Sequence, residues 1–141
     1  SFEFYGEEKD LCLRLIDGGY RTVYLPDALM IHEPDQAGRS QQRYLRYVTR
    51  NDCLNALYND PLSRLAWILP ARLAIYFRMR RAWNVDDPWG WAWILWELWK
   101  NAGRVWRDRK PVSRATVATW KQLRRCPEPY APPPGTLIPE P

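Results

Sequence analysis

Tryptophan is confined to the second half of this 141-residue chain, and this uneven distribution constrains the fold more than any other feature. All nine tryptophans lie from Trp67 to Trp120. Charge changes at the same place. Residues 1–60 hold 7 Lys and Arg against 10 Asp and Glu, a net charge of −3, whereas residues 61–141 hold 14 against 6, a net charge of +8. Asn59-Asp60-Pro61 is a helix-stopping sequence at the junction. The chain therefore joins two differently built segments.

The first segment mixes the periodicities of helices and strands. Apolar residues at helical spacing alternate along it with the every-second-residue pattern of strands. Gly18-Gly19 supplies a left-handed residue to end the first helix. The predicted elements are helices over 7–17 and 40–58 and strands over 20–25 and 28–32. Residues 1–60 are therefore expected to form an α/β structure.

The second segment is predicted to be a mainly α-helical, basic and Trp-rich extension. Residues 61–126 contain three stretches with helical periodicity, over 62–82, 89–107 and 113–125. Ser113 is a typical N-cap for the last of them, and Asp87-Pro88 fits an N-cap followed by a proline at the first helical position. Residues 127–141 include 7 prolines in 15 positions, which predicts an extended, disordered tail.

One stretch of the first segment carries a set of spaced motifs. They are Phe4-Tyr5-Gly6-Glu7-Glu8-Lys9-Asp10-Leu11-Cys12-Leu13-Arg14, Gly19-Tyr20-Arg21, Tyr24-Leu25-Pro26-Asp27-Ala28 and Ile31-His32-Glu33. Together they resemble the acceptor-side block of family 2 glycosyltransferases, in which an acidic pair opens a helix, and a Gly-Tyr turn, a strand, a Pro-Asp-Ala turn and a terminal His follow. The resemblance covers residues 4–33, with a weaker echo at Thr49-Arg50-Asn51. It implies that residues 1–60 are the C-terminal part of a GT-A (Rossmann-like) domain.

The resemblance assigns the chemistry to three residues. Glu8 stands at the family's general base, which takes the proton of the acceptor hydroxyl, and Glu7 is its acidic partner. The family more often carries Asp at the base position. His32, the only histidine in the chain, matches the ligand of the divalent metal, Mn²⁺ or Mg²⁺, that holds the leaving diphosphate. Taken alone, the two glutamates also fit first-turn acids that favour the helix dipole, and His32 fits a surface histidine.

Three more residues are candidates for substrate contacts. Tyr5 is a candidate for stacking on an acceptor sugar, Asp10 for binding the acceptor, and Arg50 for binding the diphosphate. Each has a structural alternative. Tyr5 also suits core packing, and Asp10 is spaced to pair with Arg14 across one helix turn. Arg50 equally suits a structural ion pair.

The nucleotide-binding half of such an enzyme is missing from the sequence. The family holds its donor through an earlier Rossmann-like half with an Asp-x-Asp metal motif, and no Asp-x-Asp occurs here. Asp86-Asp87 precedes a proline and fits a helix cap instead. We therefore expect an incomplete inverting glycosyltransferase. It would use a nucleotide-sugar donor and a saccharide or lipid-linked acceptor to build cell-envelope or secreted polysaccharide.

The basic and aromatic residues of the second segment indicate contact with an anionic surface. The run from Trp89 to Trp99 is too short to span a bilayer, but tryptophans flanked by arginines suit a helix lying at the headgroup level. We therefore expect a cytoplasmic protein bound peripherally to the inner face of the plasma membrane through residues 61–126. Packing of these tryptophans on the catalytic part or on a second copy is the alternative, which leaves open a homo-oligomer.

Two other classes of function are alternatives to an enzyme. A non-catalytic membrane-surface association or interaction module would use residues 1–60 only as a platform for the basic helices. Nucleic-acid binding would suit the sequence pI of about 9.3. We do not expect nucleic acid as a partner, because the basic residues lie on predicted helices and no known binding motif is present.

Overall fold

The computed structural model describes residues 6–22 and 40–126, and this part of the chain is all helical. Its helices are α1 (Glu7–Asp17), α2 (Gln41–Asn59), α3 (Leu62–Ala82), α4 (Gly90–Asp108) and α5 (Arg114–Arg125). Each was predicted from the periodicity of apolar residues. The observed bounds of α1 and α3 are those predicted, and the other three helices agree closely.

The α/β fold class, with a GT-A (Rossmann-like) portion in residues 1–60, is wrong. No strand occurs within 6–22 or 40–126, and residues 20–22, the start of the first predicted strand, do not form one. A strand is stable only where a neighbour takes up its backbone hydrogen bonds, and the described chain offers no such neighbour. The rest of that strand, the second predicted strand and the tail from 127 lie outside the described residues.

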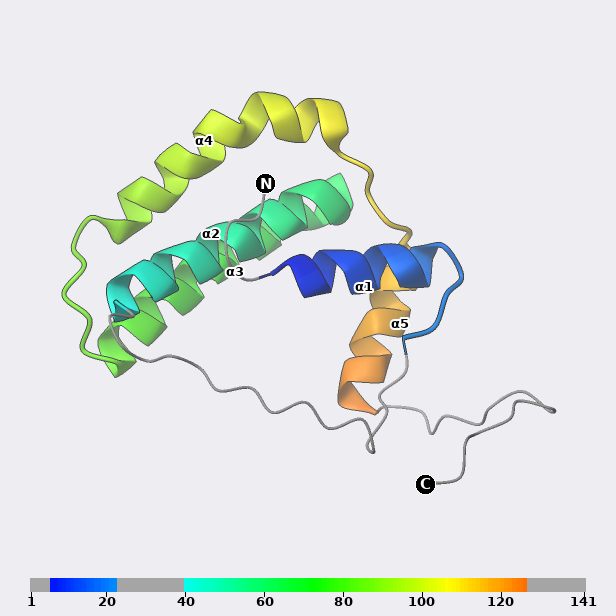
Figure 1. Cartoon of the computed structure of the whole chain (residues 1–141), viewed down its shortest axis with the longest axis horizontal. Coiled ribbons are helices and arrows are strands. Elements are labelled where there is room, and N and C mark those ends of the chain that lie inside the picture. The colour runs from blue at the N-terminus through cyan, green and yellow to red at the C-terminus, as the bar shows by residue number, and fades with distance from the viewer. Residues whose placement is uncertain (1–5, 23–39, 127–141) are drawn as a thin grey trace, which may run out of the picture.

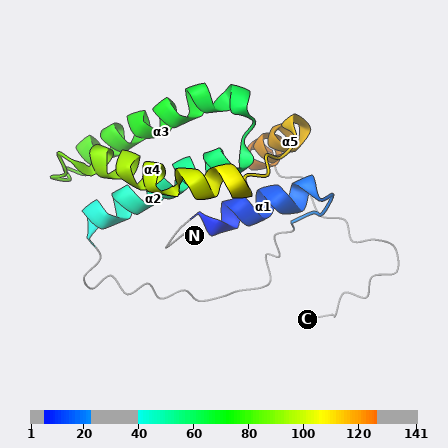
Figure 2. The same ribbon diagram turned by 90° about the horizontal axis from the view of Figure 1, so that it is seen from above.

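Helix α2 is the centre of the arrangement. Both α3 and α4 pack against it, and α1 contacts both α2 and α5. In Figure 1, α2 and α3 run side by side, and α1 and α5 lie together toward the C-terminal end of α2. The perpendicular view in Figure 2 shows the same pairing of α1 with α5. Because α2 belongs to the first predicted segment and α3 and α4 to the second, the two segments pack on each other.

Two small apolar clusters hold these helices together. The first joins α2, α3 and α4 through the buried residues Leu45, Tyr76 and Ile94. The second joins α1 to α5 and the residues before it through Leu13, Val112 and Val117, with Trp120 packed alongside. The second cluster fixes where α1, and with it the predicted acidic pair, lies relative to the rest of the structure.

Helix ends follow the capping residues that the sequence indicates, with one exception. The hydroxyl oxygens of Ser40 and Ser113 accept N–H bonds from the first turns of α2 and α5, at 3.3 and 2.9 Å. Gly19, with a φ of 81°, ends α1 through the backbone bonds of a Schellman motif. The exception is Asp87, because α4 begins at Gly90 without a side-chain cap. The interpretation of Asp87 as a helix cap is therefore wrong.

Asp87 is instead the centre of a buried network between α2, α3 and the start of α4. Its fully buried carboxylate accepts hydrogen bonds from Gln42 at 3.0 Å, Arg46 Nε at 2.9 Å and the Tyr76 hydroxyl at 2.7 Å. Burial alone would raise the pKa of Asp87, but these hydrogen bonds, that from Arg46 first, lower it to about 2. Gly90 is required beside the network, because a Cβ there would lie 1.9 Å from an Asp87 oxygen.

Candidate functional site

The acidic pair predicted to carry catalysis opens α1. Gly6 precedes it with a φ of 102°, a left-handed conformation that favours glycine. Glu7 and Glu8 are both exposed, and neither carboxylate forms a hydrogen bond or ion pair with the part of the chain that the structure describes. The positive end of the helix dipole favours their negative charge. No described residue pairs with either carboxylate, so both are available to a substrate.

Three buried asparagines of α2 fix the start of α1. Asn51, Asn55 and Asn59 recur at every fourth position on one face of α2, and each is at most 1% exposed. The Asn55 amide donates to the Gly6 carbonyl at 3.1 Å, and the Asn59 amide donates to Asp10 Oδ1 at 2.6 Å. Gly6 lies against Asn51, where an added Cβ would be 3.4 Å from the Asn51 Cβ. The role of this asparagine face was not predicted from the sequence, although amides spaced by four residues were a signal for it.

Asp10, predicted to bind the acceptor, is engaged by its neighbours. Arg14 Nε donates to its two carboxylate oxygens at 3.1 and 3.0 Å, which confirms the pairing across one helix turn. Lys9, one residue earlier, forms an ion pair with Asp52 of α2 at 3.2 Å. These contacts anchor α1 on α2. A contact of Asp10 with an acceptor stays a prediction.

Arg50, predicted to bind the diphosphate, is buried between α2 and α4. Its guanidinium lies 3.6 Å from Glu97 Oε2 and 4.6 Å from the ring centroid of Tyr47. Its Nε donates to Asn51 Oδ1 at 3.0 Å. The structural ion pair considered for Arg50 is therefore confirmed, and a contact with diphosphate stays a prediction. Asn51 links Arg50 to the start of α1, because the same asparagine lies against Gly6.

The remaining predicted site residues, Tyr5 and His32, lie outside the described residues. Tyr5 directly precedes Gly6 in the sequence. Within 6–22 and 40–126, no group of three or more His, Cys, Asp or Glu side chains is placed to hold a metal ion. The structure thus places the acidic pair and Asp10 together on α1, while the roles assigned to Tyr5 and His32 stay predictions.

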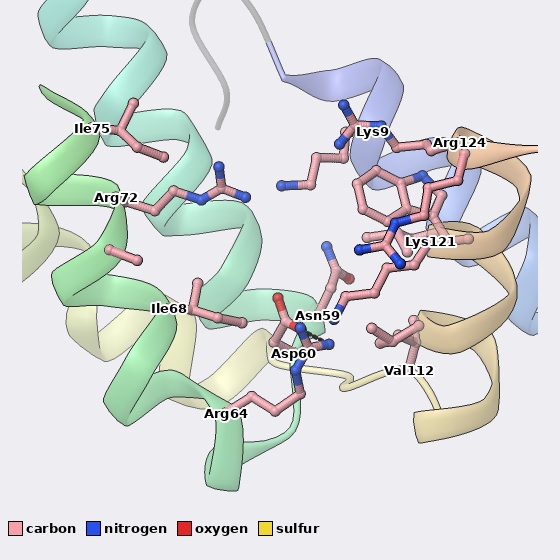
Figure 3. Close-up of a pocket in the computed structure, with 15 residues that line it drawn as sticks. Lys9, Asn59, Asp60, Arg64, Ile68, Arg72, Ile75, Val112, Lys121 and Arg124 are labelled. Carbon is pink, nitrogen blue, oxygen red and sulfur yellow. Dashed lines mark ion pairs between the residues drawn. The ribbon is translucent and has the colours of Figure 1, made fainter. Parts of the chain in front are cut away.

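A pocket of about 480 Å³ opens between α1, α3 and α5, as Figure 3 shows. Cations from all three helices line it: Lys9, Arg64, Arg72, Lys121, Arg124 and Arg125. The sequence interpretation noted the positive charge of the second segment but not this pocket. Its walls come from segments more than a hundred residues apart, so no local pattern marks it.

Most tryptophans of the chain are exposed, and several of them lie on α4. Seven of the nine tryptophans are exposed: Trp67, Trp83, Trp89, Trp91, Trp96, Trp99 and Trp106. Leu95, Trp99 and Trp106 follow one another at helical spacing and form one exposed stripe, and Trp99 stacks on Trp96 with ring centroids 4.9 Å apart. Exposed apolar patches of this kind mark contact surfaces. Among the described helices, none combines the length and the apolar character needed to cross a bilayer.

Comparisons of the chain with protein-family models, with curated proteins and with solved structures found no match. The resemblance to family 2 glycosyltransferases therefore rests only on the motifs of residues 4–33 and on the weaker echo at residues 49–51.

Proposed function

We propose that this chain is the acceptor-side part of an inverting glycosyltransferase similar to those of family 2. Its donor would be a nucleotide sugar and its acceptor a saccharide or a lipid-linked sugar. The observation that carries the proposal is the acidic pair at the start of α1. Glu7 and Glu8 are exposed and form no hydrogen bond or ion pair with the described residues, and the bond from Asn55 to the Gly6 carbonyl anchors the start of α1 on α2.

In this proposal Glu8 takes the proton from the acceptor hydroxyl as the oxygen attacks the anomeric carbon. The bond to the donor diphosphate breaks on the opposite face of the sugar, which inverts its configuration. Glu7 orients the hydroxyl. Donor binding would come from residues beyond this chain, because the chain has no Asp-x-Asp. A divalent metal would neutralise the diphosphate, and His32, its proposed ligand, lies outside the described residues.

Sugar transfer by the full-length enzyme tests this proposal most directly. Glu8→Gln removes the basic oxygen and preserves the size of the side chain. Because Glu8 is exposed and forms no hydrogen bond or ion pair with the described residues, the substitution should leave α1 folded. Loss of transfer in a folded variant supports the role of Glu8, and unchanged transfer overturns it.

A second role, membrane-surface association, is supported by the exposed stripe on α4. Tryptophan suits the headgroup level of a bilayer, where an apolar ring meets water. Exposed Lys100, Arg104 and Arg107 lie on the same helix and suit contact with anionic lipid. We propose that α4 lies on the inner face of the plasma membrane and brings the site to a lipid-linked acceptor. The same role would remain for a non-catalytic module if the transfer activity were disproved.

Trp106→Ala is expected to weaken binding of the 141-residue chain to vesicles that contain anionic phosphatidylglycerol. Trp106 is 81% exposed, so its loss should not affect folding. Burying a large apolar side chain contributes roughly 1.5–3 kcal/mol, which predicts at least about tenfold weaker partitioning in a flotation assay. Vesicles of neutral lipid should bind the wild-type chain less tightly.

Trp67→Ala is the matched control, because Trp67 is 80% exposed but lies on α3. It should float like the wild-type chain. An equal loss in the two variants would extend the contact surface to α3. If the wild-type chain does not float and sediments as a dimer, the stripe contacts a second copy instead of a membrane.

A further inference from the structure

The pocket between α1, α3 and α5 holds more positive charge than nearby carboxylates neutralise. Asp60 pairs with Arg64 at 2.9 Å, and Asp52 pairs with Lys9 at 3.2 Å and with Arg72 at 3.3 Å. Two carboxylates therefore serve three of the six lining cations. The other three, which we call the α5 cations, form no ion pair with any described residue: Lys121, Arg124 and Arg125. The six cations and the two carboxylates together leave four positive charges that no carboxylate neutralises.

These cations face the pocket from more than one side. In Figure 3, Arg72 from α3 and Lys9 from α1 extend toward each other across the opening, and Lys121 reaches in from α5. Asp52 offsets the repulsion between Lys9 and Arg72, but the α5 cations have no such carboxylate among the described residues. Basic residues in the last turn of α5 favour its helix dipole, which accounts for Arg124 and Arg125 alone. It does not account for Lys121, nor for the excess of six lining cations over two carboxylates.

The rest of the lining is mostly apolar, with Asn59 as a further polar residue. Its apolar residues come from both sides of the opening, with Ile68 and Ile75 on α3 and Val112 opposite them; Leu13 and Trp120 also line the pocket. A volume of about 480 Å³ lies within the usual range for pockets that bind small molecules, and it exceeds the space that a bare phosphate fills. Cations and apolar side chains thus lie next to each other around the opening, which suits a ligand that carries both an anionic group and an apolar part.

We propose that this pocket binds a phosphate or diphosphate group carried on an apolar chain. Guanidinium groups bind phosphate oxygens through paired hydrogen bonds, and Arg64, Arg72, Arg124 and Arg125 supply them, while Lys121 adds an ammonium donor. The apolar chain contacts the apolar lining residues beside these donors, such as Ile68 and Trp120. This inference goes beyond the proposed transfer and does not depend on it, because no residue of the acidic pair lines the pocket.

Isothermal titration calorimetry on the 141-residue chain tests this site with three probes: dodecyl phosphate below its micelle concentration, inorganic diphosphate, and the uncharged dodecyl maltoside. We expect saturable binding of dodecyl phosphate at one site, weaker binding of diphosphate, and no binding of dodecyl maltoside. Lys121→Gln combined with Arg124→Gln should weaken dodecyl phosphate binding about tenfold or more, because hydrogen bonds to charged groups are the stronger class. Both side chains are exposed, so helix content by circular dichroism should be unchanged.

Arg78→Gln combined with Arg81→Gln is the matched control. Both arginines are exposed on α3 and lie outside the pocket lining, so the pair removes the same charge elsewhere. Equal weakening by the two double variants would overturn the site, because it would show attraction to overall charge only. Diphosphate binding as tight as dodecyl phosphate would overturn the apolar-chain part and identify a free anion as the ligand. Glu8→Gln should leave this binding unchanged, so a failure here is distinct from a failure of the transfer proposal.

Discussion

Replacing Glu8 by Gln in the full-length enzyme should slow sugar transfer by roughly 10²–10⁴-fold, the usual contribution of a general base. The amide has no basic oxygen to accept the proton of the acceptor hydroxyl, while its size and hydrogen-bonding reach are preserved. Stability should fall by no more than about 0.3–1 kcal/mol, the contribution of a first-turn charge to the helix dipole, because the Glu8 carboxylate is exposed and forms no hydrogen bond or ion pair with the described residues. Initial rates with a nucleotide-sugar donor, measured beside the thermal unfolding midpoint, separate the two effects.

Two further substitutions sharpen this test of the acidic pair. Glu8→Asp keeps a carboxylate and should retain part of the rate, because it removes one methylene and leaves the base. Glu7→Gln should cost less than Glu8→Gln if Glu7 only orients the hydroxyl. A reversed order, with Glu7→Gln the more damaging, would move the base to Glu7. Wild-type rates in both Gln variants would leave the pair as first-turn acids that favour the helix dipole.

The helices were predictable because their signals are local. The apolar spacing within α1 and the glycines after it lie within a few residues of each other, and so do Ser113 and the turn that it caps. Such signals act through neighbouring backbone groups and do not need the rest of the fold. The same holds for the pairing of Asp10 with Arg14, which lie one helix turn apart.

Interactions between distant segments were not predictable in this way. A strand at residues 20–25 depends on a neighbouring strand that its own sequence does not specify, and the α/β class assumed one. Asp87 precedes a proline and so looks like a helix cap, but its partner Arg46 lies forty-one residues earlier in α2. The bonds from Asn55 and Asn59 to α1 each span forty-nine residues. Polar side chains at helical spacing suggest such contacts without naming the partner.

Asp87→Asn should lower the free energy of unfolding by about 3 kcal/mol, near the low end of the cost of removing one partner from a buried ion pair. The amide that replaces the carboxylate would still accept hydrogen bonds, but the guanidinium of Arg46 would lose its counter-charge in a site where the Asp87 carboxylate is fully buried. Urea unfolding followed by circular dichroism measures the change. Asp86→Asn makes the same chemical change on an exposed neighbour, and surface substitutions of this kind stay within about 0.5 kcal/mol.

Lowering the pH should reduce the difference in the free energy of unfolding between the wild-type chain and Asp87→Asn. The pKa of Asp87 in the folded chain, about 2, lies below its ordinary value of 3.8. Its negative charge therefore stabilises the fold at pH values above 3.8. This contribution is lost as the pH falls from about 4 toward 2, because the folded carboxylate then takes up its proton. The asparagine variant has no such proton to bind. A difference in unfolding free energy that stays constant from about pH 6 to pH 3 would show that Arg46 and Tyr76 do not hold Asp87 as a carboxylate, and the network would then stabilise the fold by packing alone.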